Sequence, residues 1–138
     1  MHYIILIYGD EKNFAMMSES PEAKADMYAA FMRYGADMQA AGVLRGGAEL
    51  KPTHSATTVR VRNGKTLTTD GPFAETKEQL GGFYLIEARD LNDAIQVASR
   101  IPSARTGSIE VRPVVDTLPL RMRTVVALAT GCSASPAT

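Results

Sequence analysis

The residues best suited to do chemistry gather in one stretch, 69–83, near the middle of the chain. Glu75 carries a carboxylate that could act as a general base, and Lys77 could neutralise an anionic ligand or a developing oxyanion. Asp70 stands before a Gly-Pro pair that is typical of a tight turn, and it could contact a ligand directly. Polar loops of this kind run over the surface and often carry function.

Each of these side chains also has a purely structural interpretation. Glu75 could hydrogen-bond backbone amides of its own loop, and Asp70 could serve only to start the turn. Lys77 could pair with Glu78 or Glu75 at the surface, where an ion pair contributes little stability. The residue types alone leave both interpretations open.

Candidates outside this stretch are few. Arg112 could bind a carboxylate bidentately, or it could pair with Glu110 or with an acidic residue of a partner. We interpret His54 as a surface residue because no acid–base companion is visible, and His2 as incidental. Two scattered histidines and the single Cys132 give no metal-ligand spacing, and no nucleotide-binding glycine pattern is present. We therefore predict no metal and no cofactor.

The bulk composition indicates one soluble domain. The chain has 138 residues, of which 45% are hydrophobic and 22% charged, as expected for a protein with a packed core. Its 15 basic and 15 acidic residues cancel, which argues against broad binding of nucleic acid. A single cysteine and a first apolar run too short for a signal peptide or membrane span favour the cytoplasm.

Periodicity places these candidates on a definite set of elements. Apolar or alternating runs predict strands at 3–8, 57–62, 65–69, 83–86 and 108–115, with a weaker strand within 43–52. Helical spacing predicts one helix over 21–41, capped by Ser20 and ended by Gly42. Asp90 should cap a second helix that Pro102 ends, with a buried stripe made of Leu91, Ala94, Ile95, Ala98 and Ile101.

The Asn63-Gly64 pair predicts a hairpin between the strands at 57–62 and 65–69. A two-residue loop would place Leu67 opposite Arg60, whereas a three-residue loop would place it opposite Val59. We predict the three-residue loop, because it puts the apolar side chains on one face of the hairpin.

This element order predicts a ferredoxin-like βαββαβ α+β sandwich with an added β-hairpin. Both helices then cover one face of the sheet. The strands at 3–8 and 83–86 are apolar on both faces, so the second face also needs a cover. We therefore predict a homodimer that places sheet on sheet in a dimeric α/β-barrel-like assembly.

The stretch 69–86, which reads TDGPFAETKEQLGGFYLI, resembles the signature of the DGPF-domain proteins, a branch of the YCII-related family. Residues 3–10, 41–44, 56–62 and 111–114 resemble it as well. The resemblance covers about residues 1–116, one domain, and leaves the tail 117–138 with Cys132 outside. It implies a ferredoxin-like dimeric fold and a bacterial, cytoplasmic protein, often encoded beside extracytoplasmic-function sigma factors.

In the wider family a histidine on the first helix and an aspartate after a Gly-Pro step are proposed as an acid–base pair, and one relative is a dehydrochlorinase of a chlorinated hydroquinone. By this resemblance Glu75 stands about where the aspartate would be, but the helix at 21–41 contains no histidine. The family implies no general activity.

We therefore expect a small acidic or phenolic molecule to bind near the dimer interface, against Asp70, Phe73, Tyr84 and Arg112. Acid–base lyase or isomerase chemistry would then use Glu75 as the base and Lys77 as its electrostatic partner. The alternative is a non-catalytic dimeric sensing or regulatory module linked to sigma factors. Besides this ligand, the expected partner is a second copy of the chain, and we expect neither nucleic acid nor a membrane.

Overall fold

The computed structural model describes residues 1–13 and 20–115, so the tail with Cys132 lies outside the described residues. The elements in chain order are β1 (His2–Gly9), α2 (Pro21–Ala40), β2 (Leu44–Glu49), η1 (Thr53–Ser55), β3 (Thr57–Arg62), β4 (Lys65–Asp70), β5 (Gln79–Glu87), α3 (Leu91–Ser99), η2 (Pro102–Arg105) and β6 (Ser108–Pro113). Each predicted strand and both predicted helices are present.

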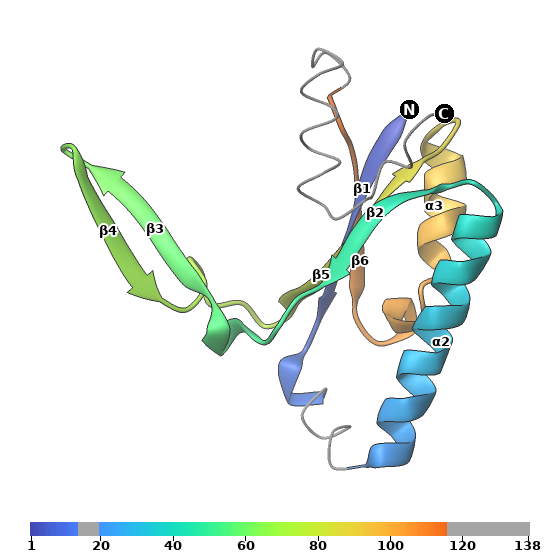
Figure 1. Cartoon of the computed structure of the whole chain (residues 1–138), viewed down its shortest axis with the longest axis horizontal. Helices are drawn as coiled ribbons and strands as arrows, with labels where there is room; N and C mark the ends of the chain where they lie inside the picture. Colours follow the sequence, from blue (N-terminus) through green and yellow to red (C-terminus); the bar gives the residue numbers. More distant parts are fainter. Residues whose placement is uncertain (14–19, 116–138) are drawn as a thin grey trace, which may run out of the picture.

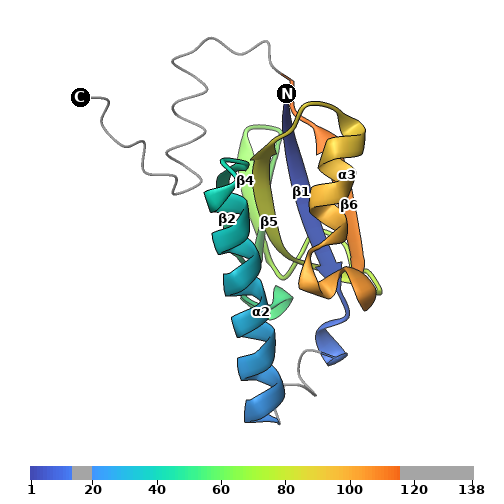
Figure 2. The same cartoon turned by 90° about the vertical axis from the view of Figure 1, so that its right-hand side faces the viewer.

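Four of the strands form one antiparallel sheet in the order β2-β5-β1-β6, with β1 paired to both β5 and β6. Helices α2 and α3 lie side by side against one face of this sheet (Figures 1 and 2). This mixed α+β arrangement is compatible with a ferredoxin-like fold.

The core lies between the sheet and the two helices. Alternation along β1 points Tyr3 and Ile5 toward the helices, where both are buried, and sends Ile4 and Leu6 to the opposite face. The rest of the buried cluster comes from both helices, β5 and the segments that follow β5 and α3: Tyr34, Met38, Ile86, Ala88, Ala94, Val97, Ala98 and Ile101. The helical face of the sheet is therefore the packed one.

The predicted helix ends are confirmed. The Ser20 hydroxyl accepts a hydrogen bond from the backbone N–H of Ala23, and Gly42 follows the helix with a φ of +72°. Asp90 accepts a hydrogen bond of 2.8 Å from the backbone N–H of Asp93 at the start of α3. These signals are local, so they do not depend on how the elements pack.

The predicted stripe of α3 is wrong in part. Ala94 and Ala98 are buried as expected, but Leu91 is 51% exposed and Ile95 is 44% exposed. Val97 is buried instead. The two alanines have small side chains, so this face of α3 packs against the sheet and turns the larger Leu91 and Ile95 outward.

The predicted hairpin register is also wrong. Strands β3 and β4 pair Arg62 with Lys65 and Arg60 with Leu67, so the loop has two residues. Asn63 has φ +52° and Gly64 has φ +74°, the positive values that a primed two-residue turn requires. Residues of this pair are exposed on both faces, so burial does not set the register and the turn residues do.

We call residues 57–70 the arm, because β3 and β4 form a separate two-stranded sheet. The arm projects away from the main sheet, on the side opposite to the helices (Figure 1). At its base the Gly71 N–H donates to the Ala56 carbonyl oxygen at 2.7 Å, and the Thr58 hydroxyl donates to the Gly71 carbonyl oxygen at 2.8 Å.

Candidate functional site

A cleft of about 910 Å³ opens beneath the N-terminal half of α2. Only Tyr34 and Met38 of this helix are buried in the core, and its earlier turns extend past the end of the sheet (Figures 1 and 2). The cleft is lined by residues from five segments of the chain, within 7–13, 24–32, 47–52, 79–84 and 103–106. A cleft of this size is large enough for a small organic molecule.

Aromatic rings form part of the cleft wall. Tyr84 projects from β5, and Tyr28 and Phe31 come from α2. The Tyr84 ring meets the edge of the buried Tyr34 ring, with centroids 5.6 Å apart and an interplanar angle of 61°. A Cβ at Gly47 would lie 2.8 Å from Cδ1 of Tyr84, so only glycine at that position leaves room for this ring.

A small set of polar groups accompanies these rings. The Tyr28 hydroxyl donates to Oε1 of Glu49 at 3.1 Å, and Nζ of Lys24 lies 5.9 Å from the centroid of the Tyr28 ring. Within the described part of the chain the Tyr84 hydroxyl has no hydrogen-bond partner. Burial, and secondly the negative charge of Glu49, raise the pKa of Tyr84, so this group is a neutral phenol that can donate a hydrogen bond.

Side-chain hydrogen bonds hold the rim of the cleft. The Glu11 carboxylate accepts bonds of 2.8 Å from both the backbone N–H and the hydroxyl of Thr53. The Gln79 side chain accepts from the Glu11 N–H at 3.0 Å and donates to the Thr76 carbonyl oxygen at 2.6 Å. These contacts join the end of β1 to η1 and to the loop before β5. Ser103, also in the lining, has a buried hydroxyl without a partner among the described residues.

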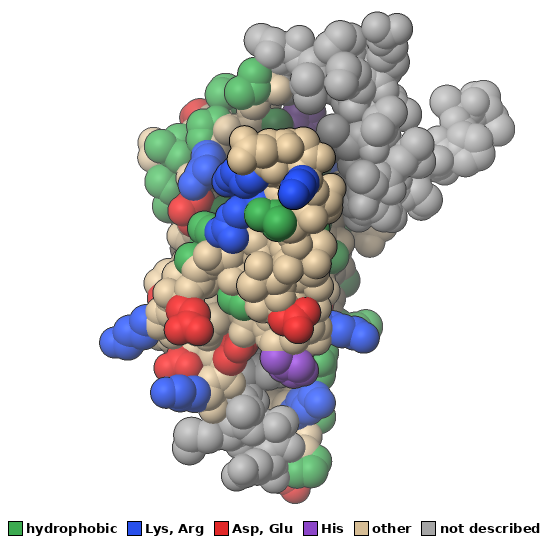
Figure 3. Space-filling view, turned by 90° about the vertical axis from the view of Figure 1, so that its left-hand side faces the viewer, with side chains coloured by type: hydrophobic (Ala, Val, Ile, Leu, Met, Phe, Trp, Pro, Cys, Tyr) green, Lys and Arg blue, Asp and Glu red, His purple; other side chains and the backbone are tan. Residues whose placement is uncertain are grey.

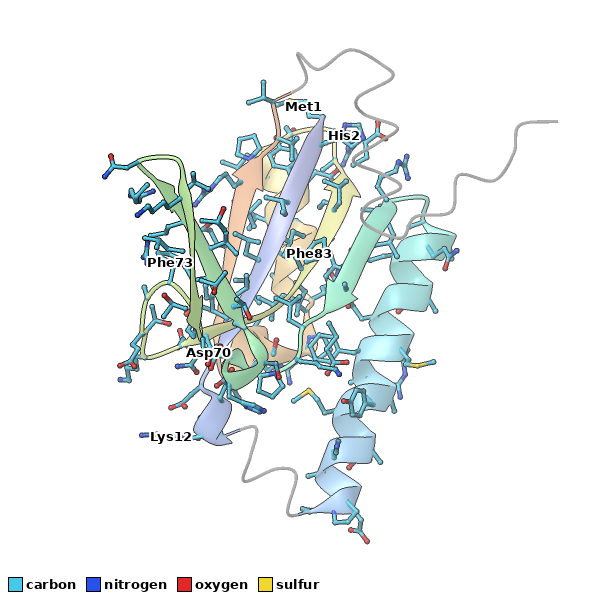
Figure 4. All side chains as sticks on the ribbon, turned by 60° about the vertical axis from the view of Figure 1, so that its left-hand side comes forward. Met1, His2, Lys12, Asp70, Phe73 and Phe83 are labelled. Atoms are coloured by element: carbon cyan, nitrogen blue, oxygen red, sulfur yellow. The ribbon has the colours of Figure 1, made fainter. Side chains whose placement is uncertain are left out.

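The predicted loop residues lie outside this cleft. Glu75 and Lys77 are exposed in the loop between β4 and β5, and Asp70 is exposed at the end of β4. Phe73 is 80% exposed. Figure 4 shows Asp70 and Phe73 out with the arm and its returning loop, apart from Phe83 in the main sheet. Of this segment only residues 79 and 81–84 line the cleft.

Arg112 and Tyr84 lie on opposite faces of the sheet. Tyr84 pairs with Ile5 on the helical face, whereas Arg112 pairs with Ile4 on the other face. The Arg112 guanidinium bonds the Glu110 carboxylate at 2.6 Å, which is one of the two roles that the sequence left open. A single chain therefore does not bring the six predicted site residues together.

The two histidines, potential metal ligands and membrane-spanning helices were the other features to consider in the structure. His54 is exposed in η1, as predicted, and Nε2 of His2 lies 3.9 Å from the Glu87 carboxylate. No group of three or more potential metal ligands is present among residues 1–13 and 20–115. No helix in those same two ranges has the length and apolar character needed to cross a membrane.

Three residues of the cleft were missed at the level of sequence. Lys24 and Tyr28 stand one turn apart on α2, and Glu49 ends β2. The useful signal was the Gly46-Gly47 pair in a short strand, since consecutive glycines in a strand mark a close approach of other groups. Which groups approach them depends on the packing of α2 and β5.

The chain is similar to known proteins. The YCII-related domain matches residues 1–118. An uncharacterised protein of Rhizobium meliloti (strain 1021) is 42% identical over 117 residues, which cover 82% of this chain and 91% of that protein. This chain therefore belongs to the YCII-related domain family.

Proposed function

We propose that this protein binds a small phenolic molecule in the cleft beneath α2. The observation that carries this proposal is the Tyr84 hydroxyl, which lines the cleft and has no hydrogen-bond partner among the described residues. A tyrosine hydroxyl can both donate and accept a hydrogen bond, so this one is available for a partner. A ligand group that accepts a hydrogen bond would supply it.

The surrounding groups favour a phenol over other small molecules. Its flat ring would pack against the rings of Tyr84 and Phe31. The ligand hydroxyl could donate a hydrogen bond to the Glu49 carboxylate, which already accepts one from the phenol of Tyr28. The same ligand hydroxyl could accept a hydrogen bond from the Tyr84 hydroxyl. The ammonium of Lys24 would attract an acidic substituent on the same ring.

The surroundings of Glu75 support ligand sensing more than catalysis. A general base that works near neutral pH usually has its pKa raised by burial, and Glu75 is exposed. Four points stay predictions: acid–base chemistry by Glu75 and Lys77, membership of the DGPF branch, a cytoplasmic location and a link to sigma factors.

The test is a thermal-shift screen with hydroxybenzoates, catechol and hydroquinone, and with benzoate as the analogue without a hydroxyl. A ligand at a hundred times its dissociation constant adds about 2.7 kcal/mol and raises the midpoint by several degrees. Tyr84→Phe removes the proposed partner. Tyr8→Phe is the matched control, because it removes the same atom from the other face of the sheet, outside the cleft.

A shift seen with phenols, lost in Tyr84→Phe and kept in Tyr8→Phe, would support the proposal. A shift kept in both variants would place the ligand elsewhere on the protein. Absence of any shift with phenols would refute this ligand class.

A further inference from the structure

A second pocket, of about 240 Å³, opens on the helical side of the molecule. One face of α2 supplies most of its lining, within 30–41, and Val43, Arg100 and Pro102 complete it. The end of α3 and the start of η2 stand beside the middle of α2 in Figure 2, which views the molecule from this side. No residue lines both this pocket and the cleft. We call it the α2–α3 pocket and treat it as a separate site.

Two arginines from distant parts of the sequence meet at the α2–α3 pocket. Arg33 comes from α2, and Arg100 directly follows α3. Neither guanidinium makes a hydrogen bond or an ion pair with a residue that the structure describes. Burial raises the pKa of Tyr34 in the pocket wall, and the positive charge of Arg100 opposes this rise. The charge of Arg100 therefore lies close to the pocket wall.

One carboxylate accompanies the two arginines. Asp37 stands one turn after Arg33 on α2, and its side chain has no hydrogen bond or ion pair within residues 1–13 and 20–115. These three are the charged residues of the lining, so two positive charges and one negative charge leave one positive charge over. Asp37 can balance only one guanidinium at a time. A ligand with a single negative charge would neutralise the pocket.

The remaining walls of the α2–α3 pocket are largely apolar. Met38 is buried, and Ala30, Val43 and Pro102 are half-buried. Pockets for drug-sized ligands have volumes of about 300–1,000 Å³, so this smaller pocket suits a molecule of a few carbon atoms. The walls offer such a molecule a place for its hydrocarbon part.

We infer that the α2–α3 pocket binds a small aliphatic monocarboxylate. Its carboxylate lies between Arg33 and Arg100, because the guanidinium group matches the geometry of a carboxylate and binds it bidentately. Its hydrocarbon chain packs against Met38 and Val43. A dicarboxylate would bring a second negative charge against the apolar wall and near Asp37, so it fits less well. This site does not depend on the phenol proposed for the cleft.

Basic side chains also gather on the opposite side of the molecule, as Figure 3 shows. Arg60, Arg62 and Lys65 are exposed on the arm, and they line neither the cleft nor the α2–α3 pocket. Without enclosing walls, such residues attract anions of any size or shape. The arm therefore provides an internal comparison for non-specific attraction.

The test is a nuclear magnetic resonance titration of the isotope-labelled full chain with butyrate, at constant ionic strength so that screening does not change. Butyramide is the neutral analogue and succinate the dianionic analogue, and all three molecules have four carbon atoms. We expect butyrate to shift the amide signals of Ala30, Asp37 and Val43. Butyramide should leave these signals unchanged, and succinate should bind more weakly than butyrate.

Four variants test the role of each charge. Arg33→Gln and Arg100→Gln should each weaken butyrate binding at least about fivefold, because each removes one charge-assisted contact. Arg105→Gln is the matched control, since Arg105 is an exposed arginine of η2 outside the pocket lining, and it should leave binding unchanged. Asp37→Asn raises the charge of the lining from one to two positive, so butyrate should bind more tightly and the disadvantage of succinate should shrink.

Several results would overturn the inference. Butyrate might shift no signals, or shift only those of the arm, which would leave the pocket without this ligand. Equal binding of butyramide would show that charge is not recognised. Equal weakening in Arg105→Gln and Arg100→Gln would show general attraction rather than a site. Tighter binding of succinate than of butyrate by the wild type would refute the assignment of a monocarboxylate.

Discussion

Replacement of Tyr34 by phenylalanine tests how the core holds the wall of the cleft. The Tyr34 hydroxyl is buried and donates a hydrogen bond of 2.7 Å to the Val97 carbonyl oxygen, which joins α2 to α3. The Tyr34 ring also supports the ring of Tyr84 from the core side. Phenylalanine keeps the ring and its edge contact, and it removes only the hydrogen bond.

The expected cost follows from the hydrogen bond alone. A typical intramolecular hydrogen bond contributes about 1 kcal/mol to stability, and a buried carbonyl left without a partner adds to the loss. Here the Val97 carbonyl oxygen also accepts from the Arg100 N–H at 3.3 Å, so it keeps one partner. We therefore expect Tyr34→Phe to lower the free energy of unfolding by about 1 kcal/mol, or the midpoint by roughly 4 °C.

The same hydroxyl should make stability depend on alkaline pH. Burial raises the pKa of Tyr34 above its usual value of 10.0. The folded state then holds the proton longer than the unfolded state, so the stabilisation is complete below pH 10 and falls as the pH rises further. Tyr34→Phe lacks this group, so the difference in free energy of unfolding between the wild type and this variant should shrink above pH 10.

The assay is urea unfolding at pH 7 and at several values above pH 10, with Tyr8→Phe as the control. Tyr8 lies on the other face of the sheet, and removal of its hydroxyl should change the free energy of unfolding by less than about 0.5 kcal/mol. No loss of stability in Tyr34→Phe at pH 7 would refute the assigned hydrogen bond. An unchanged difference above pH 10 would refute the effect of burial on its pKa.

Two further predictions concern the backbone and a helix cap. A Cβ at Gly107 would lie 2.2 Å from a backbone oxygen of β1, so Gly107→Ala should lower the free energy of unfolding by about 3 kcal/mol. A Cβ at Gly35 would meet no atom within 4 Å, so Gly35→Ala should raise it by up to about 1 kcal/mol. Urea unfolding measures both changes, and equal effects of the two variants would contradict the packing around Gly107. The pKa of Asp93 is lowered, chiefly by the hydrogen bond from the Arg89 N–H, so its contribution is present above pH 3.8 and is lost as the pH falls below that value. Asp93→Asn should therefore reduce the loss of unfolding free energy at acid pH. An unchanged loss would count against the hydrogen bond between the Arg89 N–H and Asp93.

Local sequence signals predicted the elements and their ends well. Ser20, Gly42 and Asp90 act through hydrogen bonds or dihedral angles within a few residues, and each is found in its predicted role. The register of the arm depends on a choice between turn geometry and burial. The predicted three-residue loop rests on burial, but Val59 and Leu67 are both exposed, so turn geometry decides the pairing.

The cleft could not be predicted in the same way, because its residues meet only after folding. Tyr84 was identified within the central motif, but Tyr28 and Glu49 come from a helix and a strand on either side of a turn and touch across 21 positions. No local pattern encodes that contact. Conversely, Glu75 and Lys77 stand close in sequence to Tyr84, yet they face solvent on the loop between β4 and β5, outside the cleft. Proximity along the chain was a poor guide to proximity in space.

The position of β1 in the sheet has a consequence for biosynthesis. This strand is made well before its partners, since Tyr3 pairs with Ile86 on one side and with Pro113 on the other. At roughly 5–20 residues per second, a nascent β1 waits several seconds with both edges unpaired and both faces apolar. Chains in that state are prone to associate with one another, and the high sequence separation of these pairs should make refolding slow. Chaperone dependence and inclusion-body formation are therefore expected to respond to changes in β6, the last partner to be synthesised.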